Sequence, residues 1–470
     1  MARVYFDKQI FSNLFKGEKE EYQTLLEKIK DKKLLICYSH ALLLDLKNDK
    51  TDYKYKELEF IETLVNDNYL LYHALDKKTS PYLAKPLEAF KDLENEDDNI
   101  NFDEIFNFND DTLTESEKKI YKTLKSVFYD TNFDLDINEL QTDNFPVLDK
   151  LFPKTNKSMN LIDIVEYGMN LLKTLNEEKK VYKDLRKIND ENLNNGKFIL
   201  EYDNIDFNEN FKNSLFKKTF LDYISESLNP NGKKKITKYD FFTYAYINLD
   251  ILGISKEPSK SVRFRNLMND GFHSYYGAYC DIVVSEDKGF IKKSKALYKL
   301  LNIDTKVVNT EEFLKILDND FKIDKTIESF LNRIPEFVND ENLKNCYSNI
   351  KTKKITNIYS LNENLFGYFN QINVDEKGEK IHLYFRKNRQ NYSIFNIYRE
   401  FELVVNNCFY LFGIDNFKQE EYLFHIENKQ LKNGDWKGRF WNFGTYNITV
   451  DINKNYYNEI YLLLEININN

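Results

Sequence analysis

The chain has 470 residues, enough for several domains and a large buried core. Hydrophobic residues make up 42% of it and charged residues 30%, an ordinary globular balance, and only 14 glycines and 7 prolines argue against a collagen-like or linker-rich chain. The net charge of -9 speaks against a protein that coats nucleic acid through a basic surface. It is compatible with a nuclease, in which metal ions and a local basic strip supply positive charge.

None of the four cysteines, Cys37, Cys280, Cys346 and Cys408, belongs to a Cys-x-x-Cys pair, so no zinc site is expected. All four have apolar neighbours in the sequence, which predicts buried free thiols. The first residues include the acidic Asp7 and no long apolar stretch, which is unlike a signal peptide. No apolar run is long enough to span a bilayer. We therefore expect a cytoplasmic protein with no membrane partner.

Residues 1–75 alternate between strands and helices. Short apolar runs predict strands over residues 3–7, 34–38 and 69–73. Apolar side chains at helical spacing predict helices over residues 10–30, 40–47 and 54–65. Ser39 stands just before the second of these helices and is a good N-cap for it. This alternation is typical of the first half of a doubly wound α/β domain.

Residues 76–254 lose the alternation, and we interpret them as a helical insertion. Helices are predicted there over residues 116–128, 160–175, 207–227 and 238–249. The α/β pattern returns over residues 255–318, which we interpret as the second half of the interrupted domain. Strands are predicted in it over residues 281–285 and 305–308, and helices over residues 262–279, 288–301 and from residue 310 onward.

The last third of the chain differs in character. Residues 319–350 are predicted to be a helical connector, and residues 351–470 a β-rich (α+β) C-terminal domain with one helix near residues 395–405. Trp436 and Trp441 stand among glycines in that domain. They could form a base-stacking or partner surface, and the core of a β domain explains them equally well.

Carboxylates occupy comparable places in the two α/β segments. Asp7 follows the first strand and Asp287 follows the strand at residues 281–285. Because the carboxyl ends of parallel strands form the ligand crevice of an open sheet, these two acids should converge. Asp45 and Asp270 lie in predicted helices and would project toward the same place. Clustered carboxylates repel each other and are tolerated when a hard divalent cation compensates them, which predicts Mg²⁺ or Mn²⁺.

Four stretches carry a resemblance to a known family. Residues 4–11, a hydrophobic strand followed by Asp and an apolar helix start, look like the opening of PIN domains. Residues 37–45 resemble the Tyr-Ser capped helix of bacterial PIN-like proteins, and residues 270–278 resemble the Asp-led helix of that family. Residues 283–290 resemble its motif of hydrophobic strand, Ser, x, Asp, x, x, Phe. Together the resemblance spans residues 1–75 and 255–318, which is a plausible size for one compact domain.

The resemblance implies a PIN-like doubly wound parallel sheet, split by the helical insertion, with a metal site. The implied metal-binding and catalytic residues are Asp7, Asp45, Asp270 and Asp287, with Ser285 as a supporting hydroxyl and Asp281 as a fifth acid. Asp45 stands where the family more often has Glu, and Glu57 and Asp49 are the alternatives at that position. The side chains that could contact substrate are Ser285, Lys288, Lys292 and His273.

Each of these residues also has an ordinary explanation. Asp7 and Asp287 could simply cap the helices that follow them, and Asp45 could lie on a solvated helix face. His273 is explained as well by a hydrogen-bonded histidine inside a helix. The lysines after Asp287 could likewise form a solvated face.

The implied function is that of a metal-dependent endonuclease acting on nucleic acid, with RNA favoured over DNA. Regulated toxins and antiviral defence effectors are a plausible setting, and the C-terminal domain would be the place for a protein partner or regulator. One alternative is a PIN-like scaffold or binding protein with a weakened site, which the aspartate at position 45 keeps open. A structure-selective DNA nuclease is another, although such enzymes usually have more acids and a helical DNA-binding motif.

Overall fold

The computed structural model describes residues 3–31, 34–95, 126, 132–133, 147, 151, 159–189, 191, 206–233, 235–255, 264–321, 324–349, 354–377, 379–388, 392–454 and 459–467. The chain forms two compact units. The first unit joins Met1–Phe90 to Phe272–Asn470, and the second is Lys91–Gly271. No helix in the described ranges combines the length and apolar character needed to cross a membrane.

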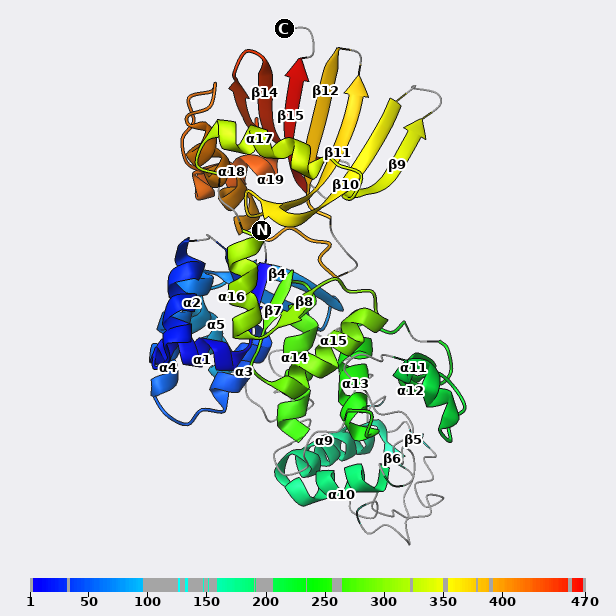
Figure 1. Cartoon of the computed structure of the whole chain (residues 1–470). Helices are drawn as coiled ribbons and strands as arrows, with labels where there is room; N and C mark the ends of the chain where they lie inside the picture. The colour runs from blue at the N-terminus through cyan, green and yellow to red at the C-terminus, as the bar shows by residue number, and fades with distance from the viewer. Residues whose placement is uncertain are drawn as a thin grey trace. The chain divides into compact units, whose positions relative to one another are not determined.

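The first unit contains a six-stranded sheet in the order β4-β3-β2-β1-β7-β8 (Figure 1). Its strands are β1 (Arg3–Phe6), β2 (Leu35–Ser39), β3 (Asn68–His73), β4 (Lys78–Leu83), β7 (Ile282–Val284) and β8 (Lys306–Val308). All neighbouring strands are parallel except β3 and β4, which are antiparallel. From β1 the chain builds the sheet outward to β3 and later adds β7 on the other side of β1. The sheet therefore has its topological switch point between β1 and β7.

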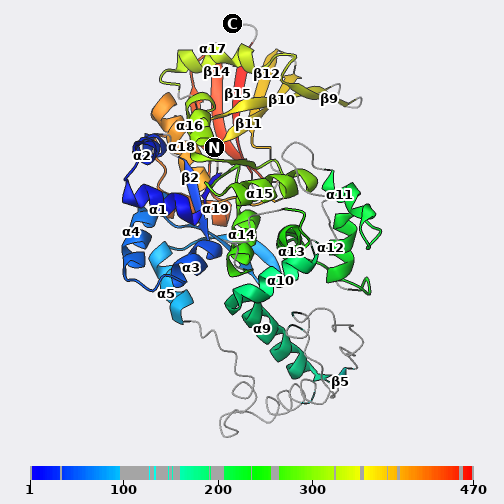
Figure 2. The ribbon, with the colours of Figure 1, turned by 60° about the horizontal axis from the view of Figure 1, so that its bottom comes forward.

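Helices cover both faces of this sheet, as a doubly wound fold requires. Phe6 packs on Phe11 and Phe313, while Tyr5, whose side chain points the other way, packs on His273. The helices of this part are α1 (Lys8–Lys16), α2 (Glu20–Asp31), α3 (His40–Lys47), α4 (Tyr53–Val65), α5 (Pro86–Asn95), α14 (Phe264–Gly277), α15 (Lys288–Leu300) and α16 (Thr310–Asn319). Figure 2 shows α14 beside α15. The α/β part of the prediction is confirmed.

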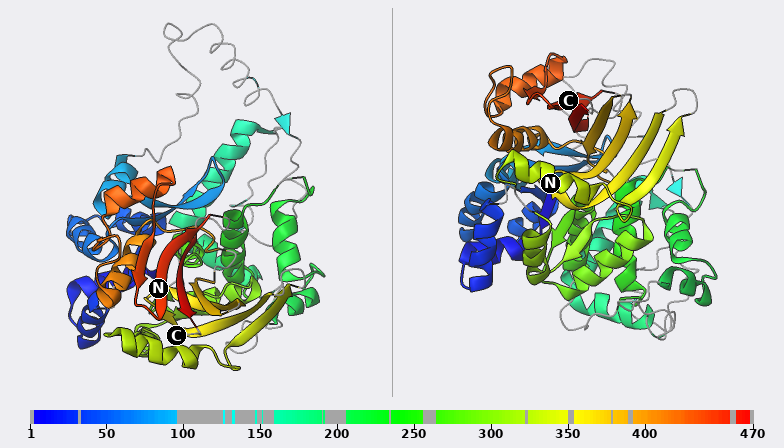
Figure 3. Two further views of the ribbon diagram at one scale, coloured as in Figure 1. Left: turned by 90° about the horizontal axis from the view of Figure 1, so that it is seen from above. Right: turned by 45° about the horizontal axis from the view of Figure 1, so that its top comes forward.

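A seven-stranded antiparallel sheet follows in the same unit, in the order β13-β14-β15-β12-β11-β10-β9 (Figure 3). Its strands are β9 (Leu343–Asn349), β10 (Lys354–Leu365), β11 (Phe369–Lys377), β12 (Lys380–Arg386), β13 (Arg439–Asn442), β14 (Tyr446–Asn453) and β15 (Glu459–Asn467). Its helices are α17 (Ile327–Phe337), α18 (Arg399–Phe412) and α19 (Phe424–Asn433). The β-rich character expected for the C-terminal part is confirmed, and both tryptophans, Trp436 and Trp441, are buried in its core.

Two boundaries and the burial of one cysteine in the first unit differ from the predictions. The chain after residue 76 still belongs to the sheet, because β4 pairs with β3 and the first unit extends to Phe90. The predicted connector helix ends with α17, and β9 takes the place of its second half. Cys346, predicted to be buried, lies on β9 and is exposed, whereas the other three cysteines are buried.

The second unit is mainly helical in its described residues. Its helices are α9 (Leu161–Glu177), α10 (Lys179–Asn189), α11 (Phe207–Asn210), the 3-10 turn η4 (Phe211–Asn213), α12 (Phe220–Leu228) and α13 (Lys238–Ile251), and β5 (Asn132–Phe133) pairs with β6 (Met159–Asn160). The single helix predicted over residues 207–227 is interrupted, because Thr219 caps a new helix by accepting a hydrogen bond from Asp222 N at 3.1 Å. The helix predicted over residues 116–128 lies outside the described residues apart from residue 126, which is helical.

Candidate functional site

Asp7 and Ser285 meet where β1 and β7 end. The Asp7 amide donates to the Val284 carbonyl at 3.1 Å, which continues the pairing of β1 with β7 beyond the last strand residue. The Ser285 hydroxyl then donates to Asp7 Oδ2 at 2.7 Å. These two residues are 278 positions apart in the sequence. The fold thus joins the two halves of the α/β domain at its switch point, where ligands bind in open sheets.

Electrostatics link Asp7 to two further carboxylates. Burial raises the pKa of Asp7, and the charges of Asp45 and Asp287 raise it further. His273 and the hydroxyl of Ser285 act in the opposite direction and lower it. Asp45 and Asp287 therefore lie close enough to Asp7 to repel its negative charge. The structure brings these three of the four predicted acids into one electrostatic group.

Asp45 is held by a chain of hydrogen bonds that runs into the sheet. His273 Nε2 lies 3.0 Å from Asp45 Oδ2, and His273 Nδ1 lies 2.7 Å from the Tyr5 hydroxyl. The Tyr5 hydroxyl is in turn 2.6 Å from Ser39 Oγ, which accepts a bond from the Ala41 amide at the start of α3. The predicted N-cap role of Ser39 is confirmed. An ionised carboxylate can only accept a hydrogen bond, so His273 Nε2 must carry the proton that it donates to Asp45.

These hydrogen bonds correct the expectation that His273 contacts substrate. The residue is 1% exposed, and both ring nitrogens have partners inside the protein. His273 therefore acts on Asp45 rather than on a ligand in solvent. The predicted alternative of a hydrogen-bonded helix histidine describes it better. No local pattern in the sequence signals the partnership, since Asp45 and His273 are 228 positions apart.

Asp7 and Asp287 differ in whether the carboxylate caps the helix that follows it. Asp7 stands at the N-cap position of α1, but its carboxylate forms no capping hydrogen bond with the described residues of that helix. Asp287 does cap α15, because Asp287 Oδ1 accepts from the Phe290 amide at 2.8 Å. Its own amide donates to Ser285 Oγ at 3.1 Å. Asp287 is exposed, so its carboxylate caps the helix and faces solvent.

Asp270 lies on α14 three residues before His273, and it is half-buried. The division between the two units passes through this helix after Gly271, so Asp270 belongs to the second unit. Residues three apart on a helix share one face. The assignment of Asp270 as the fourth acid remains a prediction.

Asp281 is at the wrong end of β7 for a fifth metal ligand. Its carboxylate accepts from the Arg3 amide at 2.7 Å and pairs with Lys387 Nζ at 2.6 Å. Arg3 begins β1 and Asp7 follows its end, so strand geometry separates the two places by about 13 Å. The sequence suggested Asp281 because it adjoins the same strand as Asp287. The direction of β7 rules it out of this cluster.

The two alternatives to Asp45 are engaged elsewhere. Glu57 is buried, accepts a hydrogen bond from Ser12 and lies 3.9 Å from Lys8 Nζ. Asp49 accepts two hydrogen bonds from Thr51, at 2.9 and 2.8 Å, within a local turn. Asp45, in contrast, raises the pKa of Asp7. Asp45 is thus the better candidate at this position.

The lysines after Asp287 differ in accessibility. Lys288 is exposed, next to Asp287, and Lys292 is half-buried one turn further along α15. Lys293, the next residue along the helix, is buried. Lys295, further along the same helix, is also exposed, so solvent reaches Lys288, Lys292 and Lys295. Lys288 and Lys292 are placed one turn apart on α15.

The donor set suits a hard divalent cation held partly by water. In the part of the chain that the structure describes, no three His, Cys, Asp or Glu side chains stand close enough to enclose an ion by themselves. Mg²⁺ commonly binds through one or two carboxylates and keeps several waters. The charges of Asp45 and Asp287 act on Asp7, and the binding of such an ion beside Asp7 remains a prediction.

Comparisons of the chain with family models, with curated proteins and with solved structures gave no match. The resemblance to PIN-like proteins therefore rests on the four motifs and on the residues described above.

Proposed function

We propose that this protein is a PIN-like, metal-dependent nuclease that hydrolyses phosphodiester bonds, with RNA favoured over DNA. The observation that carries the proposal is the hydrogen bond from Ser285 to Asp7 at the switch point of a parallel sheet. It unites two motifs of the resemblance that stand at opposite ends of a long insertion. The preference for RNA comes from the resemblance alone.

In this proposal Asp7, Asp45 and Asp287 hold Mg²⁺ or Mn²⁺. When bound, such an ion would supply an activated water and stabilise the charge of the leaving oxygen. Ser285 fixes one oxygen of Asp7 and His273 fixes one oxygen of Asp45, so the carboxylates keep their orientation. Lys288 and Lys292 would neutralise the phosphates of a bound strand beside Asp287.

A cleavage assay tests the proposal directly. The full chain is incubated with end-labelled RNA or DNA in Mg²⁺, Mn²⁺ or EDTA, and binding of Mn²⁺ is measured by calorimetry. We expect RNA cleavage that needs the metal and that falls at least about a hundredfold in Asp7→Asn and in Asp287→Asn. Asp435→Asn, which changes an exposed acid on the C-terminal part, is the matched control and should retain activity. Cleavage that persists in both site variants would refute the assigned residues.

One observation favours a second function, that of a PIN-like scaffold or binding protein. One oxygen of Asp45 is bonded to His273 and one oxygen of Asp287 caps α15, which leaves fewer donors for an ion. The same experiment separates the two functions. A chain that cleaves neither nucleic acid and binds no Mn²⁺ would be a scaffold.

A further inference from the structure

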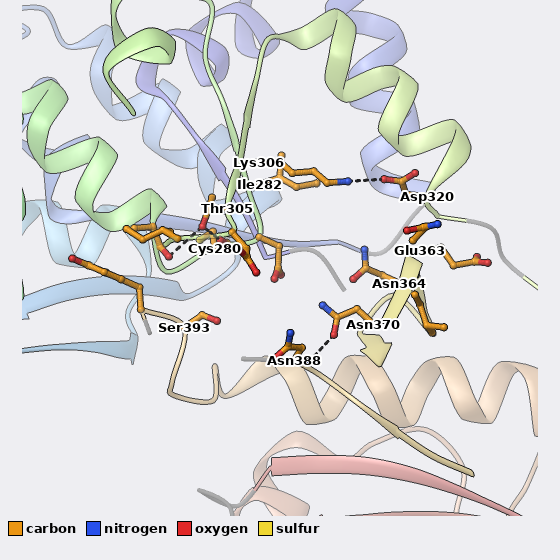
Figure 4. A pocket seen from close by; sticks show the side chains of 17 residues that line it. Cys280, Ile282, Thr305, Lys306, Asp320, Glu363, Asn364, Asn370, Asn388 and Ser393 are labelled. Atoms are coloured by element: carbon orange, nitrogen blue, oxygen red, sulfur yellow. Dashed lines mark hydrogen bonds and ion pairs between the residues drawn. The ribbon is translucent and has the colours of Figure 1, made fainter. Parts of the chain in front are cut away.

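A recess lies away from the carboxylates, at the amino ends of β7 and β8, within the first unit. It has a volume of about 160 Å³ and is lined by Ile282 and Lys306 on one side, and by the end of β10, the start of β11 and residues after β12 on the other. Figure 4 shows Asn364, Asn370 and Asn388 around it, and the ion pair of Lys306 with Asp320 at its rim. Asp7 follows the opposite end of β1, so the recess is separate from the candidate metal site.

The charges of this recess are largely compensated within the protein. Asp281 pairs with Lys387 at 2.6 Å, and Asp320 pairs with Lys306 at 3.1 Å. Glu363 is paired with Arg333. Asp304 is the remaining acid of the lining. The recess thus presents a small excess of negative charge, which disfavours a phosphate or a carboxylate as its occupant.

Side-chain amides give the recess its chemical character. The side-chain amides of Asn362, Asn364 and Asn388 form no hydrogen bond with any other residue that the structure describes. Asn370 uses its Oδ1 to accept from the Asn388 backbone at 2.7 Å. An amide offers a donor and an acceptor side by side, and a hydroxyl group likewise both donates and accepts. An array of amides therefore matches a ligand that carries several hydroxyl groups.

We propose that this recess binds a small, uncharged, hydroxyl-rich molecule the size of one sugar ring. The volume equals that of about five liquid waters, which a single ring with its hydroxyls would displace. The lining also includes the buried side chains of Tyr392, Ile303 and Ala278, against which the carbon atoms of a ring can pack. The ligand binds by hydrogen bonds to the amides and by contact with this apolar side.

Binding can be measured without any assumption about nuclease activity. The full chain is titrated with D-ribose, D-glucose, D-galactose and D-mannose, and then with ribose 5-phosphate and glucose 6-phosphate, by saturation-transfer NMR and by thermal shift. We expect saturable binding of at least one neutral sugar and an increase in melting temperature. The phosphate should bind about tenfold more weakly than its parent sugar, because the uncompensated charge of the recess is negative.

Two variants locate the binding. Asn364→Ala with Asn388→Ala removes two amides and should weaken binding at least about tenfold. Asn433→Ala, at the exposed end of α19, is the matched control and should bind as the parent chain does. The proposal fails if none of the four sugars binds saturably. It also fails if the double variant binds as tightly as the parent, or if the phosphates bind as well as the neutral sugars.

Discussion

At the scale of single residues, the small side chain of Ser285 contacts two of the candidate metal ligands. The side chain is fully buried, donates to Asp7 and accepts from the Asp287 amide, so one hydroxyl orients two acids. Partners that orient metal ligands typically change metal affinity by 10- to 100-fold when they are removed. We expect Ser285→Ala to weaken Mn²⁺ binding by about that factor, measured by calorimetry.

A threonine provides the control for this prediction, because Ser285→Thr keeps the hydroxyl. It should retain most of the Mn²⁺ affinity if the extra methyl group is accommodated, which a melting curve checks. Equal Mn²⁺ affinity in the alanine variant and the parent would mean that the Ser285 bond only stabilises the fold.

His273 allows a second prediction at this scale. Its Nε2 proton is donated to Asp45, and Tyr5 fixes its ring through Nδ1. Replacing His273 by Phe removes the donor, whereas replacing it by Gln keeps an N–H on a side chain of similar reach. We expect Mn²⁺ affinity to fall by about 10-fold or more in His273→Phe and less in His273→Gln. Equal losses in the two variants would show that the donated proton is not what matters.

The convergence of Asp7 with the end of β7 could be anticipated for a physical reason, whereas Ser285 was expected as a supporting hydroxyl from the resemblance alone. Parallel strands align their carboxyl ends, so two short apolar runs that each end on a polar residue predict a meeting point. The partnership of His273 with Asp45 was not predictable in the same way. It depends on the packing of α14 against the sheet face that Tyr5 occupies, and no repeat in the sequence reports which helix covers which face.

At the scale of elements, α14 approaches the sheet closely at Gly277. A Cβ atom there would lie 2.5 Å from Val283 Cγ2 and 3.1 Å from the Tyr298 hydroxyl. We expect Gly277→Ala to lower the free energy of unfolding by about 1–3 kcal/mol through overpacking, measured by urea denaturation. Gly168 on α9 has no atom within 4 Å of the corresponding position. Gly168→Ala should stabilise its helix by up to about 1 kcal/mol. If both variants changed the free energy of unfolding in the same direction, this explanation would be wrong.

Elements with weak apolar patterns were missed for identifiable reasons. β4 contains Pro81 and polar residues, which is acceptable only because it is an edge strand of the sheet. β9 is also at an edge, and four of its seven residues are polar, so its alternation does not stand out. The short strands β1 and β2 were predicted because burial on both faces demands a continuous apolar run.

At the scale of the whole molecule, buried ion pairs fasten the antiparallel part of the first unit to the parallel sheet. Arg3 Nε bonds Glu400 at 2.6 Å, and both side chains are fully buried. Arg3 also donates to the carbonyls of Tyr279 and Phe395. Removing one member leaves the other charge buried without its partner. We expect Arg3→Met to cost about 3–5 kcal/mol of unfolding free energy.

The double variant Arg3→Met with Glu400→Leu tests the reason for that loss. It should regain much of the stability, since neither charge is then left uncompensated, and urea denaturation measures both variants. If the double variant is as unstable as Arg3→Met alone, the loss comes from packing and from the carbonyl bonds rather than from an orphaned carboxylate.

The ion pair of Asp281 with Lys387 also joins these two parts of the first unit, and its stability should depend on pH. Burial raises the pKa of its carboxyl, but Lys387 and Arg3 outweigh that effect and hold the pKa below its ordinary value. A carboxyl with a lowered pKa in the folded state contributes stability above its unfolded pKa of about 3.9, and this contribution is lost as the pH falls through the folded value. The stability difference between the parent and Asp281→Asn should therefore be constant near neutral pH and shrink below about pH 4. A difference that does not change with pH would contradict the prediction.

The position of β1 in the middle of the sheet has a consequence for how the protein is made. β1 leaves the ribosome before the other strands of its sheet, yet one of its two neighbours, β7, follows about 280 residues later. At a synthesis rate of 5–20 residues per second, the strand edge of β1 stays open for a time on the order of half a minute. An open edge of apolar residues pairs readily with other chains. Nascent chains that stop inside the insertion should therefore bind chaperones through residues 3–6, and binding should end once Val284 has emerged.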